Sequence, residues 1–109
     1  ICKSNSNTMK ILIIDDERSI RNSLKEILID EGYDVDVAEN GAQGCEMVDK
    51  EKYSVIFCDI KMPEMDGMEV LDRLAAMGVD SAVIMISGHG DIGTAVECIK
   101  KGAFESQKY

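Results

Sequence analysis

Carboxylates stand directly behind two apolar runs of this sequence. Residues 11–14 are followed by Asp15 and Asp16, and residues 55–58 are followed by Asp59. Apolar runs favour burial, whereas neighbouring like charges raise one another's pKa and oppose burial. A carboxylate beside a metal ion can attack phosphorus and form an aspartyl phosphate. The pattern therefore points to a charged site at the end of a buried strand.

A divalent cation would resolve the repulsion between these acids. Mg²⁺ prefers oxygen ligands in octahedral geometry and keeps several waters, so Asp15, Asp16 and Asp59 are predicted to form a magnesium site. The alternative is that Asp15 and Asp16 cap the following helix, where Asp is favoured. Capping explains neither two consecutive acids nor the separate Asp59, although Asp59 alone would suit an ordinary strand end.

A serine and several glycines follow another apolar run. Ser87 comes directly after residues 83–86, and its hydroxyl could donate to a phosphoryl oxygen. By itself this is a weak signal. Residues 88–93 match G-x-G-x-x-G, but the dinucleotide-binding fingerprint belongs to a first strand and needs an acid about 20 residues further on. The glycines are interpreted instead as a flexible loop beside Ser87.

Strand-like and helix-like patterns alternate along the chain. Apolar or β-branched runs occupy residues 10–14, 33–37, 53–58 and 82–86. The helical spacings between them predict inward faces made of Ile20, Leu24, Ile27 and Leu28; Cys45 and Val48; Met68, Leu71, Leu74 and Ala75; and Ile92, Val96 and Ile99. This alternation predicts an α/β doubly wound parallel sheet. The acids and Ser87 should then meet at the carboxyl edge of the sheet.

Composition narrows the class of protein. The length of 109 residues favours one domain, and the formal charge of −9 opposes a nucleic-acid surface, which needs clustered Lys and Arg. No apolar run approaches the ~20 residues that span a bilayer, so no membrane contact is predicted. The cysteines lack metal-binding spacing, which favours reduced thiols in the cytoplasm. They are Cys2, Cys45, Cys58 and Cys98.

Four stretches together resemble the receiver domain of bacterial two-component response regulators. They are residues 11–17 (ILIIDDE), 59–67 (DIKMPEMDG), 86–88 (ISG) and 101–103 (KGA), and the resemblance runs from residue 9 to about 104. Residues 87–91 (SGHGD), followed by 94–96 (TAV), resemble the receivers of nitrogen-regulator-type transcriptional activators in particular.

The resemblance implies a flavodoxin-like fold of five parallel strands and five helices, and a set of site roles. Asp59 would accept a phosphoryl group from a sensor histidine kinase. Mg²⁺ would be held by Asp16, Asp59 and the backbone carbonyl of Lys61, with Asp15 acting mainly through water. Ser87 would close on the phosphoryl group. The full-length protein would carry an output domain, an ATPase and DNA-binding unit in this subfamily.

The end of the sequence departs from the family pattern. The family's Lys at the end of the fifth strand falls on Tyr109, whereas Lys108 lies one residue early and would point to the opposite face, so its role is uncertain. We expect residues 1–8 to be an artificial remnant and residues 9–109 to be a receiver without its fifth helix. The uncovered sheet should cause marginal stability or oligomerisation, as a homodimer or by exchange of elements.

Two other functions compete with a phosphorylation switch. Aspartate-based phosphohydrolases place a second Asp two residues after the nucleophile, and Lys61 occupies that position here. A phosphorylation-independent interaction module would keep the fold without the switch, which the altered end makes plausible for this chain. The acids and Ser87 together favour the switch, which assists its own phosphoryl transfer but is not a turnover enzyme.

Overall fold

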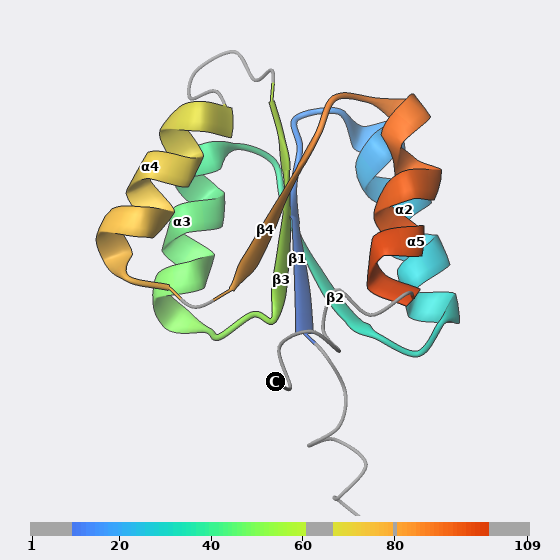
Figure 1. Ribbon diagram of the computed structural model, residues 1–109, viewed down its shortest axis with the longest axis horizontal. Helices are drawn as coiled ribbons and strands as arrows, with labels where there is room; N and C mark the ends of the chain where they lie inside the picture. The colour runs from blue at the N-terminus through green and yellow to red at the C-terminus, as the bar shows by residue number, and fades with distance from the viewer. Residues whose placement is uncertain (1–9, 61–66, 80, 101–109) are drawn as a thin grey trace, which may run out of the picture.

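A parallel sheet between two pairs of helices accounts for the part of the chain that the computed structural model describes, which is residues 10–60, 67–79 and 81–100 (Figure 1). The strands are β1 (Lys10–Ile14), β2 (Asp34–Ala38), β3 (Val55–Asp59) and β4 (Ala82–Ile86). The helices are α2 (Arg18–Asp30), α3 (Gly41–Lys50), α4 (Gly67–Met77) and α5 (Ile92–Lys100), and a 3₁₀ turn, η1 (His89–Asp91), precedes α5.

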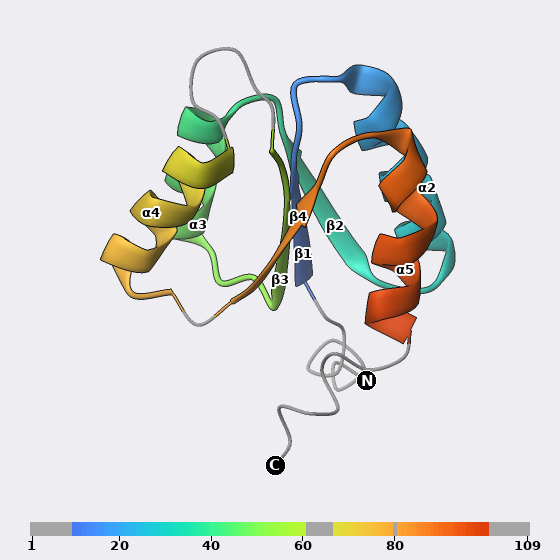
Figure 2. The same ribbon diagram turned by 45° about the horizontal axis from the view of Figure 1, so that its top comes forward.

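The sheet has the strand order β2-β1-β3-β4, and every pair is parallel. Helices α2 and α5 cover one face, and α3 and α4 cover the other (Figures 1 and 2). The predicted doubly wound α/β architecture is therefore confirmed. The described residues form four strands, and residues 102–109, where a fifth strand was expected, lie outside them.

Two apolar cores form because side chains alternate across each strand. Ile11 and Ile13 contribute to the core beneath α2 and α5, whereas Leu12 and Ile14 contribute to the core beneath α3 and α4. All residues of β3 are buried, as the unbroken apolar run predicts. The apolar run of β4 is likewise typical of a strand buried on both faces, but most of β4 is only half-buried because β3 is its only neighbour among the described strands.

Some predicted details differ from the structure. Two strands lie further along the chain than predicted, since β2 begins at Asp34 and β3 at Val55. The inward stripe predicted for the α4 segment was only partly right: Leu74 is buried as predicted, but Met68 is 57% exposed, and Val70, which was not predicted, is buried. Leu71 is half-buried and Ala75 is exposed. Residues four apart share a helix face, so Val70 and Leu74 together define the buried side.

Helix α2 shows a smaller error of the same kind. Ile20, Leu24 and Leu28 are buried as predicted, but Ile27 is 39% exposed. The helix ends before Gly32, whose φ of +96° is one that glycine adopts readily after a helix C-terminus, and α4 ends before Gly78 at φ +72° in the same way. Across the described residues, no helix is both long and apolar enough to cross a bilayer.

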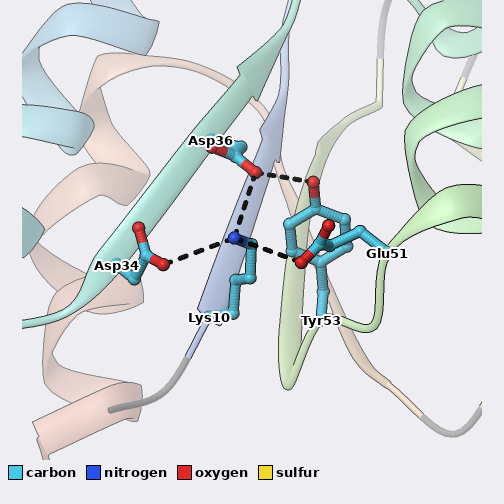
Figure 3. A network of polar contacts seen from close by, with 5 residues as sticks. All are labelled: Lys10, Asp34, Asp36, Glu51 and Tyr53. Atoms are coloured by element: carbon cyan, nitrogen blue, oxygen red, sulfur yellow. Dashed lines mark hydrogen bonds and ion pairs between the residues drawn. The ribbon is translucent and has the colours of Figure 1, made fainter. Parts of the chain in front are cut away.

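A polar network lies at the amino edge of the sheet, opposite the strand ends that carry the acids (Figure 3). The Nζ atom of Lys10 lies 3.3 Å from an Asp34 oxygen, 3.8 Å from Asp36 and 3.4 Å from Glu51. The Tyr53 hydroxyl donates to Asp36 at 2.7 Å. Burial alone would lower the pKa of Lys10, but the carboxylates around it raise that pKa overall.

Candidate functional site

Two neighbouring strands deliver carboxylates to the same edge of the sheet. The register of β1 against β3 pairs Ile14 with Cys58. Asp15 directly follows Ile14, and Asp59 directly follows Cys58. The two acids therefore come next to each other at the ends of neighbouring strands. Neighbouring strands lie about 4.8 Å apart, and paired side chains point to the same face. The ends of β1 and β3 meet at the top of Figure 1.

A third carboxylate completes the cluster. Asp15, Asp16 and Asp59 each offer an oxygen atom, and these atoms all lie within 4.8 Å of one another. Asp15 is fully buried and Asp59 is 7% exposed, whereas Asp16 is exposed. The structure thus brings together the acids that the sequence singled out, with one of them open to solvent.

Asp15 is the most constrained of these acids. Its Oδ1 atom accepts a hydrogen bond from the Glu17 N–H at 2.8 Å, but its buried Oδ2 atom has no partner among the described residues. Burial raises the pKa of Asp15 to about 6, the Glu17 N–H opposes that rise, and the charges of Asp59 and Asp16 add to it. Ionisation of Asp15 is therefore less favourable than that of a free carboxyl group, and positive charge at Oδ2, which the described residues do not supply, would favour it.

The helix-capping alternative does not account for this arrangement. The N-cap residue of α2 is Glu17, and its side chain makes no capping hydrogen bond. Asp15 and Asp16 therefore precede the cap position. Arg21, from the first turns of α2, donates to the backbone carbonyl of Asp15 at 2.7 Å and so fixes the turn between β1 and the helix.

Ser87 lies at the same edge of the sheet. The register of β3 against β4 pairs Asp59 with Ile86, so Ser87 is the residue directly beyond the partner of Asp59. Its hydroxyl donates to Asp91 Oδ2 at 2.7 Å, and its backbone N–H donates to the same oxygen at 2.8 Å. Ser87 is therefore beside the acids in the sheet order, but its hydroxyl bonds to a different carboxylate.

The donor set suits a hard cation. Three carboxylates converge, one buried oxygen has no partner among the described residues, and the exposed Asp16 leaves the cluster accessible to water. Mg²⁺ is commonly bound through one or two carboxylates together with waters and phosphate oxygens. The residues present fit a magnesium ion.

Not every predicted site residue falls within the described part of the chain. Lys61 and Lys108 both lie outside it. Sequence reasoning also missed two residues that the structure connects to the site, Arg21 and Asp91. Asp91 was visible only as an acid four residues after Ser87, and Arg21 only as a cation in the first turns of the helix that follows the acids.

Comparisons with known sequences agree on one family. The model of the response regulator receiver domain matches residues 11–106. Chemotaxis protein CheY of Listeria monocytogenes is 41% identical over 96 residues, which cover 87% of this chain and 81% of CheY. A putative NtrX-like response regulator of Rickettsia bellii is also 41% identical, over 97 residues, but these cover only 20% of that longer protein.

Solved structures share the fold. The crystal structure of FixJ-N superimposes with a TM-score of 0.70 at 32% identity, covering 89% of this chain and 78% of FixJ-N. The response regulator protein TrrA of Thermotoga maritima, solved in complex with Mg²⁺-BeF, gives a TM-score of 0.67 at 28% identity and covers 86% of this chain and 98% of TrrA.

Proposed function

The chain belongs to the response regulator receiver domain family, and from this premise we propose that it is a signalling switch phosphorylated on Asp59. The observation that carries the proposal is the convergence of Asp15, Asp16 and Asp59 within 4.8 Å at the carboxyl edge of the sheet. Asp59 is the member of this cluster that ends the central strand β3, beside β4 and Ser87. At this position the added charge of a phosphoryl group would act on both β3 and the neighbouring β4.

The proposed reaction moves a phosphoryl group from a nitrogen atom of a phosphohistidine to a carboxylate oxygen of Asp59. An Asp59 carboxylate oxygen forms a bond to phosphorus as the phosphorus–nitrogen bond of a phosphohistidine breaks, and the released imidazole takes up a proton from solvent. Such transfer depends mainly on positioning and on compensation of charge. The sensor histidine kinase that carries the phosphohistidine is the proposed partner.

The acids would hold Mg²⁺, with Asp15, Asp16, Asp59 and the backbone carbonyl of Lys61 as the proposed set and Asp15 acting mainly through water. When bound, the ion supplies positive charge opposite the phosphoryl oxygens. The burial of Asp15 keeps its carboxylate in place, and Arg21 holds the turn that carries it. The exposed Asp16 leaves an open side through which a donor can approach.

Ser87 would report the arrival of the phosphoryl group. Its hydroxyl is proposed to donate to a phosphoryl oxygen on Asp59, which requires movement of the segment between β4 and α5. The adjoining surface of α5 would then differ between the two states, and a partner could read that difference. In this role the domain is a switch in the cytoplasm that assists its own phosphorylation, and not a turnover enzyme.

The output of the switch is proposed to lie in a longer protein. The NtrX-like relative is about five times as long as the matched region, and another relative is the transcriptional regulatory protein ZraR of Klebsiella oxytoca, at 36% identity over 95 residues. These relatives favour a transcriptional output, with ATPase and DNA-binding activities placed outside this domain.

Intact mass spectrometry tests the phosphoacceptor directly. The chain is incubated with acetyl phosphate, with and without Mg²⁺, beside the Asp59→Asn variant. Asp72→Asn serves as the matched control, because Asp72 is an exposed carboxylate on α4 outside the cluster. We expect a gain of one phosphoryl group that requires both Mg²⁺ and Asp59 and survives in the control. No gain would favour a phosphorylation-independent interaction module.

A further inference from the structure

We propose that Asp91 is a positioning residue that holds the Ser87 hydroxyl in the unphosphorylated protein and competes with the phosphoryl group for it. The inference deepens the proposed function and rests on it. Nothing in the assignment of the acids or of Ser87 requires such a competitor. The consequence is that phosphorylation must break a specific bond before the switch can close.

The hydroxyl and the backbone N–H of Ser87 both donate hydrogen bonds to the same oxygen atom of Asp91. Asp91 Oδ2 accepts the Ser87 hydroxyl at 2.7 Å and the Ser87 N–H at 2.8 Å. The Asp91 N–H in turn donates to the Gly88 carbonyl at 3.0 Å, which closes the turn before α5. Gly88 has a φ of +151°, which a side-chain-bearing residue rarely adopts. In this turn the Asp91 side chain therefore reaches back to Ser87, at the connection between β4 and α5 (Figure 2).

The competition follows from the chemistry of a hydroxyl. A serine side chain has one proton and can donate one hydrogen bond at a time. In the structure that proton is given to a carboxylate, which is a stronger acceptor than a neutral group. Hydrogen bonds from Ser87 lower the pKa of Asp91, so Asp91 is ionised at neutral pH. A phosphoryl group on Asp59 can receive the Ser87 hydroxyl only after Asp91 has lost it.

Two other roles of Asp91 are distinguishable from this one, because in neither would the effect of replacing Asp91 depend on the Ser87 hydroxyl. If Asp91 only caps the turn before α5, its bond to the Ser87 N–H carries the effect, and the hydroxyl does not matter. If Asp91 only repels an incoming anion, its charge carries the effect, and again the hydroxyl does not matter. Only capture of the hydroxyl makes the effect of Asp91 vanish when Ser87 is replaced by alanine.

The experiment is a double-mutant cycle with a phosphoryl mimic. Calorimetry measures the apparent Kd for beryllofluoride in saturating Mg²⁺ for the unmodified chain, Asp91→Ala, Ser87→Ala and the double variant. We expect Asp91→Ala to tighten binding about 3- to 10-fold, since an exposed charge-assisted hydrogen bond is lost from the free state. In the Ser87→Ala background the same change should leave the Kd unaltered.

Each outcome decides a separate claim. Tightening of equal size in both backgrounds, or no tightening in either, would overturn the role of Asp91 while leaving phosphorylation on Asp59 intact. If the unmodified chain binds no beryllofluoride, the proposed function fails, and this inference fails with it. If the alanine variant does not fold, Asp91→Asn replaces it in the cycle. Its amide oxygen is a weaker, neutral acceptor, so the tightening should be smaller than for Asp91→Ala but should still vanish in the Ser87→Ala background. Thermal unfolding of each variant verifies the fold.

Discussion

Replacing Lys10 with methionine should destabilise the fold, because this one cation serves three carboxylates at the amino edge of the sheet. Its Nζ atom lies 3.3, 3.8 and 3.4 Å from Asp34, Asp36 and Glu51. In bulk water each contact at such a distance is worth about 1 kcal/mol before screening and side-chain entropy. Exposed pairs retain ~0.2–1 kcal/mol.

The network adds a second cost, since removing Lys10 leaves three acids facing one another without a cation from the described residues. The Lys10 side chain is 28% exposed and its partners are 37–55% exposed, so solvent weakens both terms. We expect the free energy of unfolding to fall by about 1–2 kcal/mol, which corresponds to a decrease in Tm of roughly 5–15 °C for a domain of this size.

Urea denaturation at low and high salt is the assay, with Lys52→Met as the matched control. Lys52 is exposed and forms no ion pair within the described residues. At 1 M salt, where the Debye length is about 3 Å, the difference between Lys10→Met and the unmodified chain should shrink by about half. A loss no larger than that of the control, or a loss independent of salt, would refute the reasoning.

The pH dependence of this contribution has a definite sign. The pKa of Lys10 is raised in the folded chain above its ordinary value of 10.5. The stabilisation is therefore fully present below pH 10.5 and is lost as the pH rises through the folded pKa. The unmodified chain and Lys10→Met should converge in stability over that alkaline range.

Two further predictions concern the acids and the packing beneath them. The pKa of Asp15 is raised from 3.8 to about 6, so the folded state holds this proton more tightly than the unfolded state does. Without a cation, the free energy of unfolding should therefore fall by up to ~3 kcal/mol as the pH rises from about 3.8 to about 6. Asp15→Asn should abolish that fall in urea titrations and also weaken stabilisation by Mg²⁺; an unchanged pH profile would contradict the assignment. Gly44→Ala should cost ~1–3 kcal/mol, because a Cβ there would overlap Ile14 Cδ1, whereas Gly93→Ala meets open space and should leave Tm unchanged or higher. Equal Tm values for the two alanine variants would show that Ile14 can move aside.

The parts of the fold that follow from local contrast were predictable. Strand β1 matches residues 10–14, and β4 matches residues 82–86, because residues 11–14 and 82–86 are unbroken apolar runs with polar residues on both sides. The same contrast identified the strand-end acids. The topology then predicted that these acids meet, since parallel strands in an α/β sheet have their carboxyl ends at one edge.

The errors arose where the sequence offers more apolar residues than the core can bury. Helix α4 contains apolar residues on several sides, and only the position of the sheet decides that Val70 is buried and Met68 is not. The bond between Ser87 and Asp91 depends on the shape of a turn, and the network around Lys10 joins three separate segments of the chain. Neither leaves a periodic signal.

The strand order also has a consequence for how the protein is made. Of the described strands β1 is synthesised first, yet it lies between β2 and β3, and its register pairs Ile11 with Val55. One edge of β1 therefore has no hydrogen-bonding partner strand until β3 has emerged from the ribosome. Since β3 ends in Asp59, the strand that completes the centre of the sheet also delivers the proposed acceptor. Under the proposed function, a nascent chain that ends before Asp59 would offer a kinase no acceptor, so we expect phosphorylation only after β3 has been synthesised.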